Sequence, residues 1–140
     1  MKSTDIRNVD KEFQDYLALQ RKNSVMLVED NDLLRGLERE TLDEDGFAVY
    51  SAGDYEHFEL YLRNGLRADL YVLDCQLPWK KGDNPQEIAE KMIEIIRQDH
   101  SNGRIVIKSA QGCENLAERL KVDVAPKGIK SVSEIVRSYF

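Results

Sequence analysis

The sequence contains no long hydrophobic run, only two cysteines and no excess of cations, and each of these absences excludes a class of protein. No stretch approaches the roughly 20 consecutive apolar residues of a membrane-spanning helix. The Met1 end carries acidic residues such as Asp5 instead of the apolar core of a signal peptide. Cys75 and Cys113 lack C-x-x-C spacing, so neither a zinc site nor a disulfide framework is indicated. We therefore expect a soluble protein of the reducing cytoplasm, with no membrane segment.

The charge balance argues against nucleic-acid binding. The chain has 20 Lys and Arg residues against 26 Asp and Glu residues, a net charge of -6, whereas affinity for a phosphate backbone comes largely from clustered cations. With 140 residues, of which 41% are hydrophobic, the chain is long enough for one packed core and too short for two ordinary domains. We expect one compact domain that does not bind nucleic acid directly.

Five short apolar runs alternate with longer segments of helical periodicity. The runs, which we expect to be strands, cover residues 24–28, 47–51, 70–73, 105–107 and 122–125. The segments between them place apolar residues three or four positions apart, as amphipathic helices do. In the first segment these residues are Leu33, Leu34, Leu37 and Leu42. Ser131 and Glu134 have the form of a capping box at the start of a last helix. Such alternation favours a parallel α/β sheet with right-handed crossovers.

Residues 1–22 precede this pattern, and we interpret them as a helical extension of the main domain at 23–140. Val9, Phe13 and Tyr16 are spaced so that they share one helical face. This face either packs on its own domain or contacts another molecule, in a homodimer or with a different partner.

Polar residues follow the apolar runs at the positions where a parallel sheet collects its ligands. The first run is followed by Glu29 and Asp30, the third by Asp74, the fourth by Ser109 and the fifth by Lys127. Ligands bind outside the carboxyl ends of parallel strands. Three carboxylates, a hydroxyl and an ammonium are therefore expected at one edge of the sheet.

Carboxylates in this position suit a magnesium-dependent phosphoryl transfer. Mg²⁺ prefers oxygen ligands and keeps few carboxylates beside a phosphate oxygen, and a carboxylate can attack phosphorus to give an acyl phosphate. Asp74 would be that nucleophile, because a charge directly behind the apolar Tyr71-Val72-Leu73 costs desolvation unless it has partners or a function. For Glu29 and Asp30 alone, a solvated loop or a helix cap is an equally simple interpretation.

Three segments resemble response-regulator receiver domains of two-component signalling. They are Leu27-Val28-Glu29-Asp30-Asn31, Val72-Leu73-Asp74-Cys75-Gln76-Leu77-Pro78 with Gly82, and Ile107-Lys108-Ser109-Ala110. The resemblance extends over about residues 24–140. It implies a flavodoxin-like, doubly wound (βα)5 fold with a parallel sheet in the strand order 2-1-3-4-5, to which our N-terminal helix would be an addition.

The resemblance also implies roles for single residues. Asp74 would accept the phosphoryl group, Glu29, Asp30, Asp74 and the Gln76 backbone carbonyl would bind Mg²⁺, Ser109 would bond a phosphoryl oxygen and Lys127 would pair with the phosphate. The donor would be the phosphohistidine of a sensor histidine kinase or phosphotransfer protein, and the product would act on a downstream protein partner. Such a domain catalyses only its own phosphorylation and dephosphorylation and is not otherwise an enzyme.

The chain departs from the family pattern near its fifth strand. The family usually has Lys followed by Pro, and here Pro126 precedes Lys127, with Lys130 as the alternative site lysine. Val124 occupies the place where many members have a switching Tyr or Phe, and the short segment from Ser109 to Lys127 requires an abbreviated fourth helix.

Two other functions remain open. A degenerate receiver would bind partners without phosphorylation, although the intact carboxylates argue against it. A phosphohydrolase with Asp74 as nucleophile would also form an aspartyl phosphate. Such enzymes usually have a second acid two residues later, where this chain has Gln76.

Overall fold

Five parallel strands form the centre of the structure, a computed structural model in which residues 11–12, 23–74, 85–99, 102–109, 114–126 and 130–140 are described. The strands are β1 (Ser24–Val28), β2 (Ala48–Ala52), β3 (Leu70–Asp74), β4 (Arg104–Ser109) and β5 (Asp123–Pro126). Their order in the sheet is β2-β1-β3-β4-β5, and every pairing is parallel. The predicted sheet and its strand order are confirmed, with every strand end within two residues of its predicted position.

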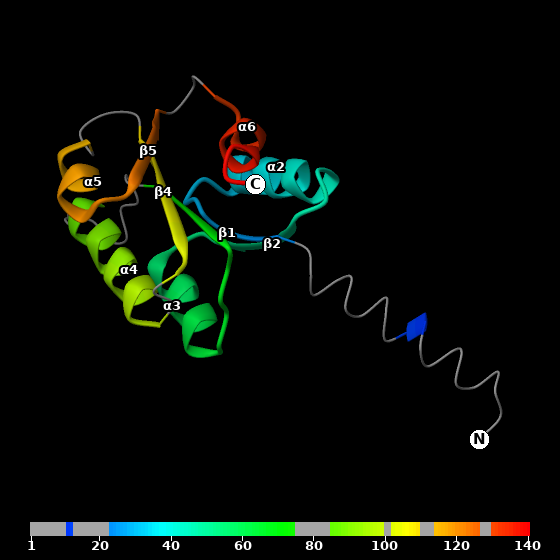
Figure 1. Cartoon of the computed structure of the whole chain (residues 1–140), viewed down its shortest axis with the longest axis horizontal. Helices are drawn as coiled ribbons and strands as arrows, with labels where there is room; N and C mark the ends of the chain where they lie inside the picture. Colours follow the sequence, from blue (N-terminus) through cyan, green and yellow to red (C-terminus); the bar gives the residue numbers. More distant parts are fainter. Residues whose placement is uncertain (1–10, 13–22, 75–84, 100–101, 110–113, 127–129) are drawn as a thin grey trace.

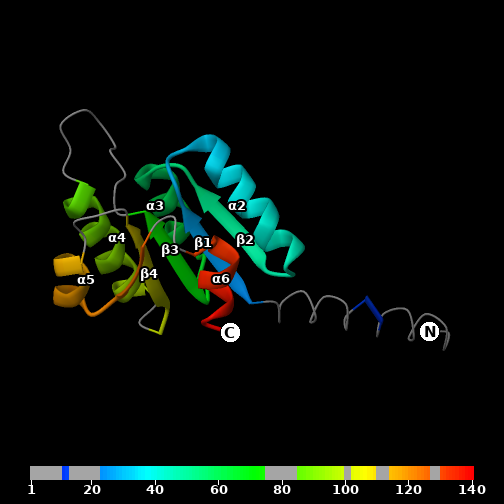
Figure 2. The same cartoon turned by 90° about the horizontal axis from the view of Figure 1, so that it is seen from above.

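Helices cover both faces of the sheet (Figures 1 and 2). They are α2 (Asp32–Glu44), α3 (Tyr55–Arg63), α4 (Pro85–Asp99), α5 (Glu114–Leu120) and α6 (Val132–Arg137). Alternate residues of each strand point to opposite faces, so Tyr71 and Leu73 pack with α3, α4 and α5, whereas Leu70 and Val72 pack with α2 and α6. The central strands β1 and β3 are thereby buried on both faces, as their unbroken apolar runs predict.

The capping residues follow the sequence. The Asn31 side chain accepts a hydrogen bond from the Leu34 backbone N–H at 2.9 Å and caps α2. The Ser131 hydroxyl accepts from the Glu134 N–H at 3.2 Å, which confirms the N-cap half of the predicted capping box. Helix α5 has only seven residues, as expected for an abbreviated fourth helix of the repeating pattern.

Helix α2 buries one leucine of its predicted pattern and exposes the other three. Leu33, Leu34 and Leu37 are exposed, and the buried residues of this helix are Glu38 and Leu42. The helix forms where its periodicity predicts, but of the four leucines in that pattern only Leu42 faces the core. The Glu38 carboxylate can occupy a core-facing position because it pairs with Lys108 on β4.

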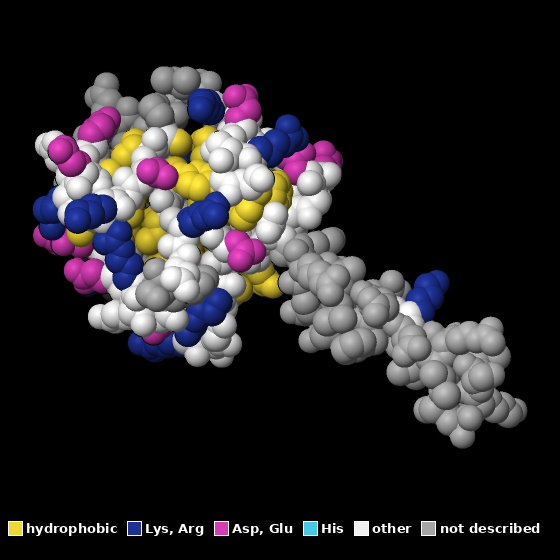
Figure 3. All heavy atoms as spheres, in the orientation of Figure 1, with side chains coloured by type: hydrophobic (Ala, Val, Ile, Leu, Met, Phe, Trp, Pro, Cys, Tyr) yellow, Lys and Arg dark blue, Asp and Glu magenta, His cyan; other side chains and the backbone are white. Residues whose placement is uncertain are grey.

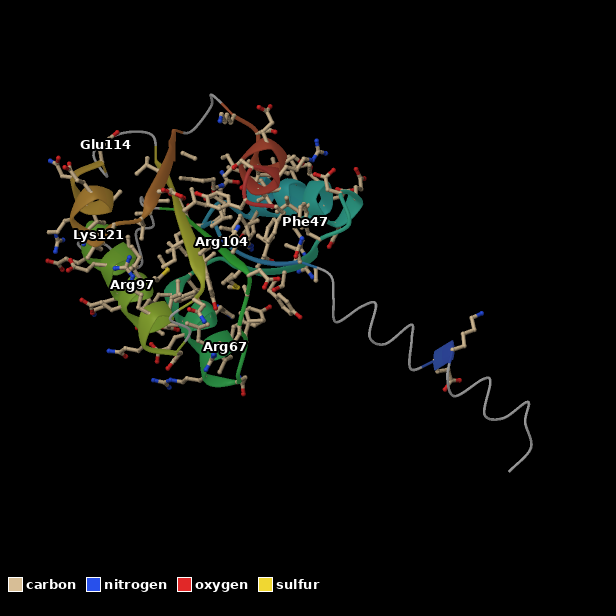
Figure 4. The ribbon with its side chains drawn as sticks, viewed as in Figure 1. Phe47, Arg67, Arg97, Arg104, Glu114 and Lys121 are labelled. Atoms are coloured by element: carbon tan, nitrogen blue, oxygen red, sulfur yellow. The ribbon has the colours of Figure 1, made fainter. Side chains whose placement is uncertain are left out.

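Contacts from the chain's last residues hold α2 and α6 together. The Asp45 carboxylate, directly after α2, accepts hydrogen bonds from the Ser133 hydroxyl and from Arg137, the latter at 2.7 Å. These two bonds lower the pKa of Asp45. Nearby, the Phe140 ring lies 5.6 Å from that of Phe47, and the Arg104 guanidinium lies over it at 6.0 Å (Figure 4).

The predicted N-terminal helix lies almost wholly outside the described residues. Only Lys11 and Glu12 are described in it, and both are helical and exposed. Among the described helices, none is long and apolar enough to cross a membrane. On the face shown in Figure 3, cationic and acidic side chains are interspersed over the body of the protein.

Because Leu42 of α2 is buried and Leu33 is exposed, replacing each by alanine should affect stability differently. Leu42→Ala should lower the free energy of unfolding by about 2–5 kcal/mol, because it leaves a cavity under the helix. Leu33→Ala should change it by less than about 0.5 kcal/mol, because Leu33 is exposed. Urea unfolding monitored by circular dichroism measures both, and equal costs would contradict the observed orientation of α2.

Candidate functional site

Three carboxylates meet at the carboxyl edge of the sheet. Glu29 follows β1 directly, Asp30 is the next residue, and Asp74 is the last residue of β3. Carboxylate oxygens of the three residues all lie within 4.8 Å of one another. Because β1 and β3 are adjacent parallel strands, their ends bring residues 45 positions apart in the chain into one cluster, as the sequence predicted.

Two of these carboxyl groups are buried. Glu29 and Asp74 are each 1% exposed, whereas Asp30 is exposed to solvent. Burial, hydrogen bonding to Asp74 and the negative charge of Asp74 together raise the pKa of Glu29 to about 7. The cluster therefore retains a proton at a pH where an ordinary glutamic acid is ionised, a condition that a bound cation would relieve.

The turn between β1 and α2 is fixed by Arg35. Its guanidinium donates to the Glu29 backbone carbonyl at 2.9 Å and pairs with the Asp32 carboxylate at 2.6 Å. Gly53, after β2, leaves the space for this guanidinium, because a Cβ atom there would collide with it. A helix cap was the alternative role considered for Glu29 and Asp30. The structure gives this role to the next residue, Asn31, which caps α2.

A lysine that the sequence interpretation did not consider lies beside the cluster. The Lys108 ammonium on β4 is 2.6 Å from the Glu38 carboxylate of α2 and 3.5 Å from that of Glu29. All three residues are buried. The sequence contained a signal for it, since Lys108 directly follows the apolar run Ile105-Val106-Ile107 of a strand that is covered on both faces.

The remaining predicted residues are only partly described. Ser109 ends β4, where its backbone pairs with that of Pro126, at the edge where Asp74 ends β3. Lys130 precedes the cap of α6 and is exposed. Gln76 and Lys127, and with them both cysteines, lie outside the described residues.

The donor set of this cluster suits a hard divalent cation. Mg²⁺ takes oxygen ligands from few carboxylates of a protein, and its other positions are left to water or a phosphate oxygen. Glu29, Asp30 and Asp74 would hold the ion. Its positive charge would offset the effects that raise the pKa of Glu29, chiefly burial and then the interactions with Asp74.

Comparison with known proteins identifies the fold. No protein-family model and no curated protein matches the sequence. The receiver domain of the Francisella response regulator 1452 matches with a TM-score of 0.64 at 23% identity, over 84% of this chain and 93% of that one. For TrrA of Thermotoga maritima, a response regulator solved in complex with Mg²⁺ and BeF, the TM-score is 0.65 at 22% identity, over 84% and 99%. For the chemotaxis response regulator CheY4 of Vibrio cholerae, the TM-score is 0.68 at 14% sequence identity, over 85% of this chain and 99% of that one. The chain therefore has the receiver-domain fold.

The raised pKa of Glu29 predicts how stability depends on pH without a metal. The folded protein holds this proton up to about pH 7, whereas an unfolded chain releases it at about pH 4.3. The contribution to stability is therefore fully present below about pH 4.3 and is lost as pH rises to about 7. The loss is at most about 4 kcal/mol, since one pKa unit corresponds to about 1.4 kcal/mol.

Glu29→Gln should remove this dependence, because an amide does not titrate. Urea unfolding of both proteins in a chelating buffer between pH 4 and 8 measures the difference. Stability curves that run parallel over this range would show that Glu29 is not the group that retains the proton.

Proposed function

We propose that the protein is a phosphoryl-accepting signalling domain, in which Asp74 takes a phosphoryl group from a phosphohistidine with the help of Mg²⁺. The observation that carries the proposal is the cluster of Glu29, Asp30 and Asp74 at the carboxyl edge of a receiver-type sheet. The structural neighbour TrrA was solved with Mg²⁺ and BeF, which supports the same pair of ligands for this chain.

The transfer uses Asp74 as the nucleophile. An Asp74 oxygen bonds to phosphorus as the bond between phosphorus and the histidine nitrogen of the partner breaks, and the imidazole leaves with that electron pair and takes up a proton. Mg²⁺, when bound, supplies positive charge to the phosphoryl oxygens. Glu29 and Asp30 hold the cation, and the Gln76 carbonyl is a further ligand in this proposal.

Neighbouring groups then bind the phosphoryl group on Asp74. A phosphoryl group carries about −1.5 to −2 charge near neutral pH and accepts strong hydrogen bonds. Ser109 at the end of β4 donates to one of its oxygens, and Lys127 after β5 pairs with its charge. The partners are a cytoplasmic histidine kinase or phosphotransfer protein as donor and a downstream protein as receiver of the signal. The domain turns over no other substrate.

Asp74→Asn should abolish phosphorylation, because an amide cannot attack phosphorus although it has the shape of the carboxylate. Intact-mass measurement after incubation with Mg²⁺ and a small phosphodonor such as acetyl phosphate detects the adduct. The wild-type protein should gain one phosphoryl group and the variant none. An adduct that persists in the variant and maps to another residue would overturn the assignment of Asp74.

The same experiment separates the three candidate functions. A stable single adduct indicates a phosphoacceptor, release of inorganic phosphate with many turnovers indicates a phosphohydrolase, and no adduct in the wild-type protein indicates a receiver that acts without phosphorylation. Asp69→Asn serves as the matched control, since Asp69 lies at the opposite end of β3, where its carboxylate accepts from the Ser24 N–H.

Magnesium should bind with an affinity that depends on Asp30. Asp30→Asn removes a charged ligand, so the Mg²⁺ concentration at half-saturation should rise about tenfold or more. Emission of Trp79, the sole tryptophan, reports the titration because it lies a few residues beyond Asp74. Asp32→Asn is the control, because Asp32 pairs with Arg35. An unchanged curve for Asp30→Asn would contradict the metal site.

A further inference from the structure

Lys108 lies between the acidic cluster and helix α2. Its side chain is 6% exposed, and the ammonium contacts the Glu38 carboxylate at 2.6 Å and the Glu29 carboxylate at 3.5 Å. A buried ammonium is costly unless carboxylates compensate it. The shorter of the two contacts is with α2, so in the unphosphorylated protein Lys108 chiefly serves as the partner of Glu38.

The backbone of Lys108 lies next to that of Asp74, the proposed phosphoacceptor. Lys108 on β4 is the direct partner of Asp74 on β3, and neighbouring strands are about 4.8 Å apart. Both side chains point to the α2 and α6 face, because Val72 and Val106, two residues before each, belong to the core of that face. The flexible four-carbon stem of a lysine can carry its charge over several ångströms without movement of the strand.

We infer that Lys108 binds the phosphoryl group of Asp74, in addition to Lys127, and that it releases Glu38 when it does so, which transmits phosphorylation to helix α2. The inference rests on the proposed function and adds a residue and a route of regulation to it. The driving force is charge: the phosphoryl group carries up to twice the charge of a carboxylate. It arises beside an ammonium whose partners among the described residues are the single carboxylates of Glu38 and Glu29.

Helix α2 is well placed to respond. Only Glu38 and Leu42 of this helix are buried, so the contact between Glu38 and Lys108 is a large part of what attaches its middle to the sheet. A carboxylate that loses its partner cannot remain buried and ionised at low cost. Glu38 therefore turns toward solvent, and the hydrogen bonds of α2 open more often.

Hydrogen exchange of the peptide 32–44, measured by mass spectrometry with and without Mg²⁺ and beryllofluoride, tests the inference on the full chain. In the wild-type protein the phosphoryl mimic should speed exchange in α2 at least fivefold, the lower end of ordinary coupling between sites. Glu38→Gln should show fast exchange already without the mimic. It should also bind beryllofluoride at least fivefold more tightly, because Lys108 no longer has to leave an ionised partner.

Glu40→Gln is the matched control. It makes the same chemical change two residues away on the same helix, but Glu40 is exposed. It should behave as wild type in both measurements. Beryllofluoride affinity that Glu38→Gln leaves unchanged or weakens would overturn the inference, because a lysine with a purely structural role does not compete with the phosphoryl group.

A double variant protects the test against loss of the fold. Lys108→Met alone leaves Glu38 buried without its cation, whereas Lys108→Met combined with Glu38→Leu replaces both partners by apolar groups, which is often neutral for stability. This variant should still acquire one phosphoryl group on Asp74 by intact mass but show no change of exchange in α2. A response equal to that of the wild type would refute the role of Lys108.

Failure of the two proposals can be told apart. If the wild-type protein acquires no phosphoryl group, the proposed function fails and the inference fails with it. If the adduct forms but exchange in α2 does not change, the inference alone is overturned. Lys127→Ala should keep the α2 response; its loss in that variant, with retention in the double variant, would assign the route to Lys127 instead.

Discussion

The repulsion among carboxylates at the end of β1 and β3 is the constraint on which the rest of the site depends. Parallel strands bring Glu29 and Asp74 together behind fully buried backbone, where water screens their charges poorly. Such a cluster persists only if something compensates it. The raised pKa of Glu29 favours a retained proton there, and the ammonium of Lys108 lies 3.5 Å from the Glu29 carboxyl group. The same excess of negative charge makes the site receptive to a divalent cation, and through it to a phosphoryl group.

The sheet and the acidic cluster could be predicted from the sequence because both depend on local patterns. Unbroken apolar runs indicate strands that are covered on both faces, and the polar residue after each run must lie at one edge once the strands are parallel. Asp74 illustrates this: its position after Tyr71-Val72-Leu73 predicts both its burial and its place at the edge, and the structure shows both.

The pairing of Lys108 with Glu38 could not be predicted in the same way. The two residues are 70 positions apart, and each is unfavourable in a core without the other. A helical pattern assigns the buried side of α2 to leucines, since it contains no information about a cation on β4. The one signal in the sequence was the position of Lys108 directly after an apolar run, where a buried ammonium requires a carboxylate as partner. A prediction that considers residues one at a time therefore fails for charged residues that are buried as pairs.

The location of Lys108 within a strand determines what kind of signal it can transmit. A lysine on a loop can respond to a phosphoryl group by moving its backbone, and the movement then spreads along that loop. The backbone of Lys108 is held between Asp74 on β3 and Ala125 on β5 by the ladders of both strands. Its response is confined to the side chain, and a change in the side chain reaches only its counter-ions. One of these, Glu29, belongs to the site itself, and the other, Glu38, belongs to α2. Val124, which stands where many receiver domains have Tyr or Phe, is partly buried and packs against the core of the opposite face. The path open to the added charge thus leads through Glu38 into α2.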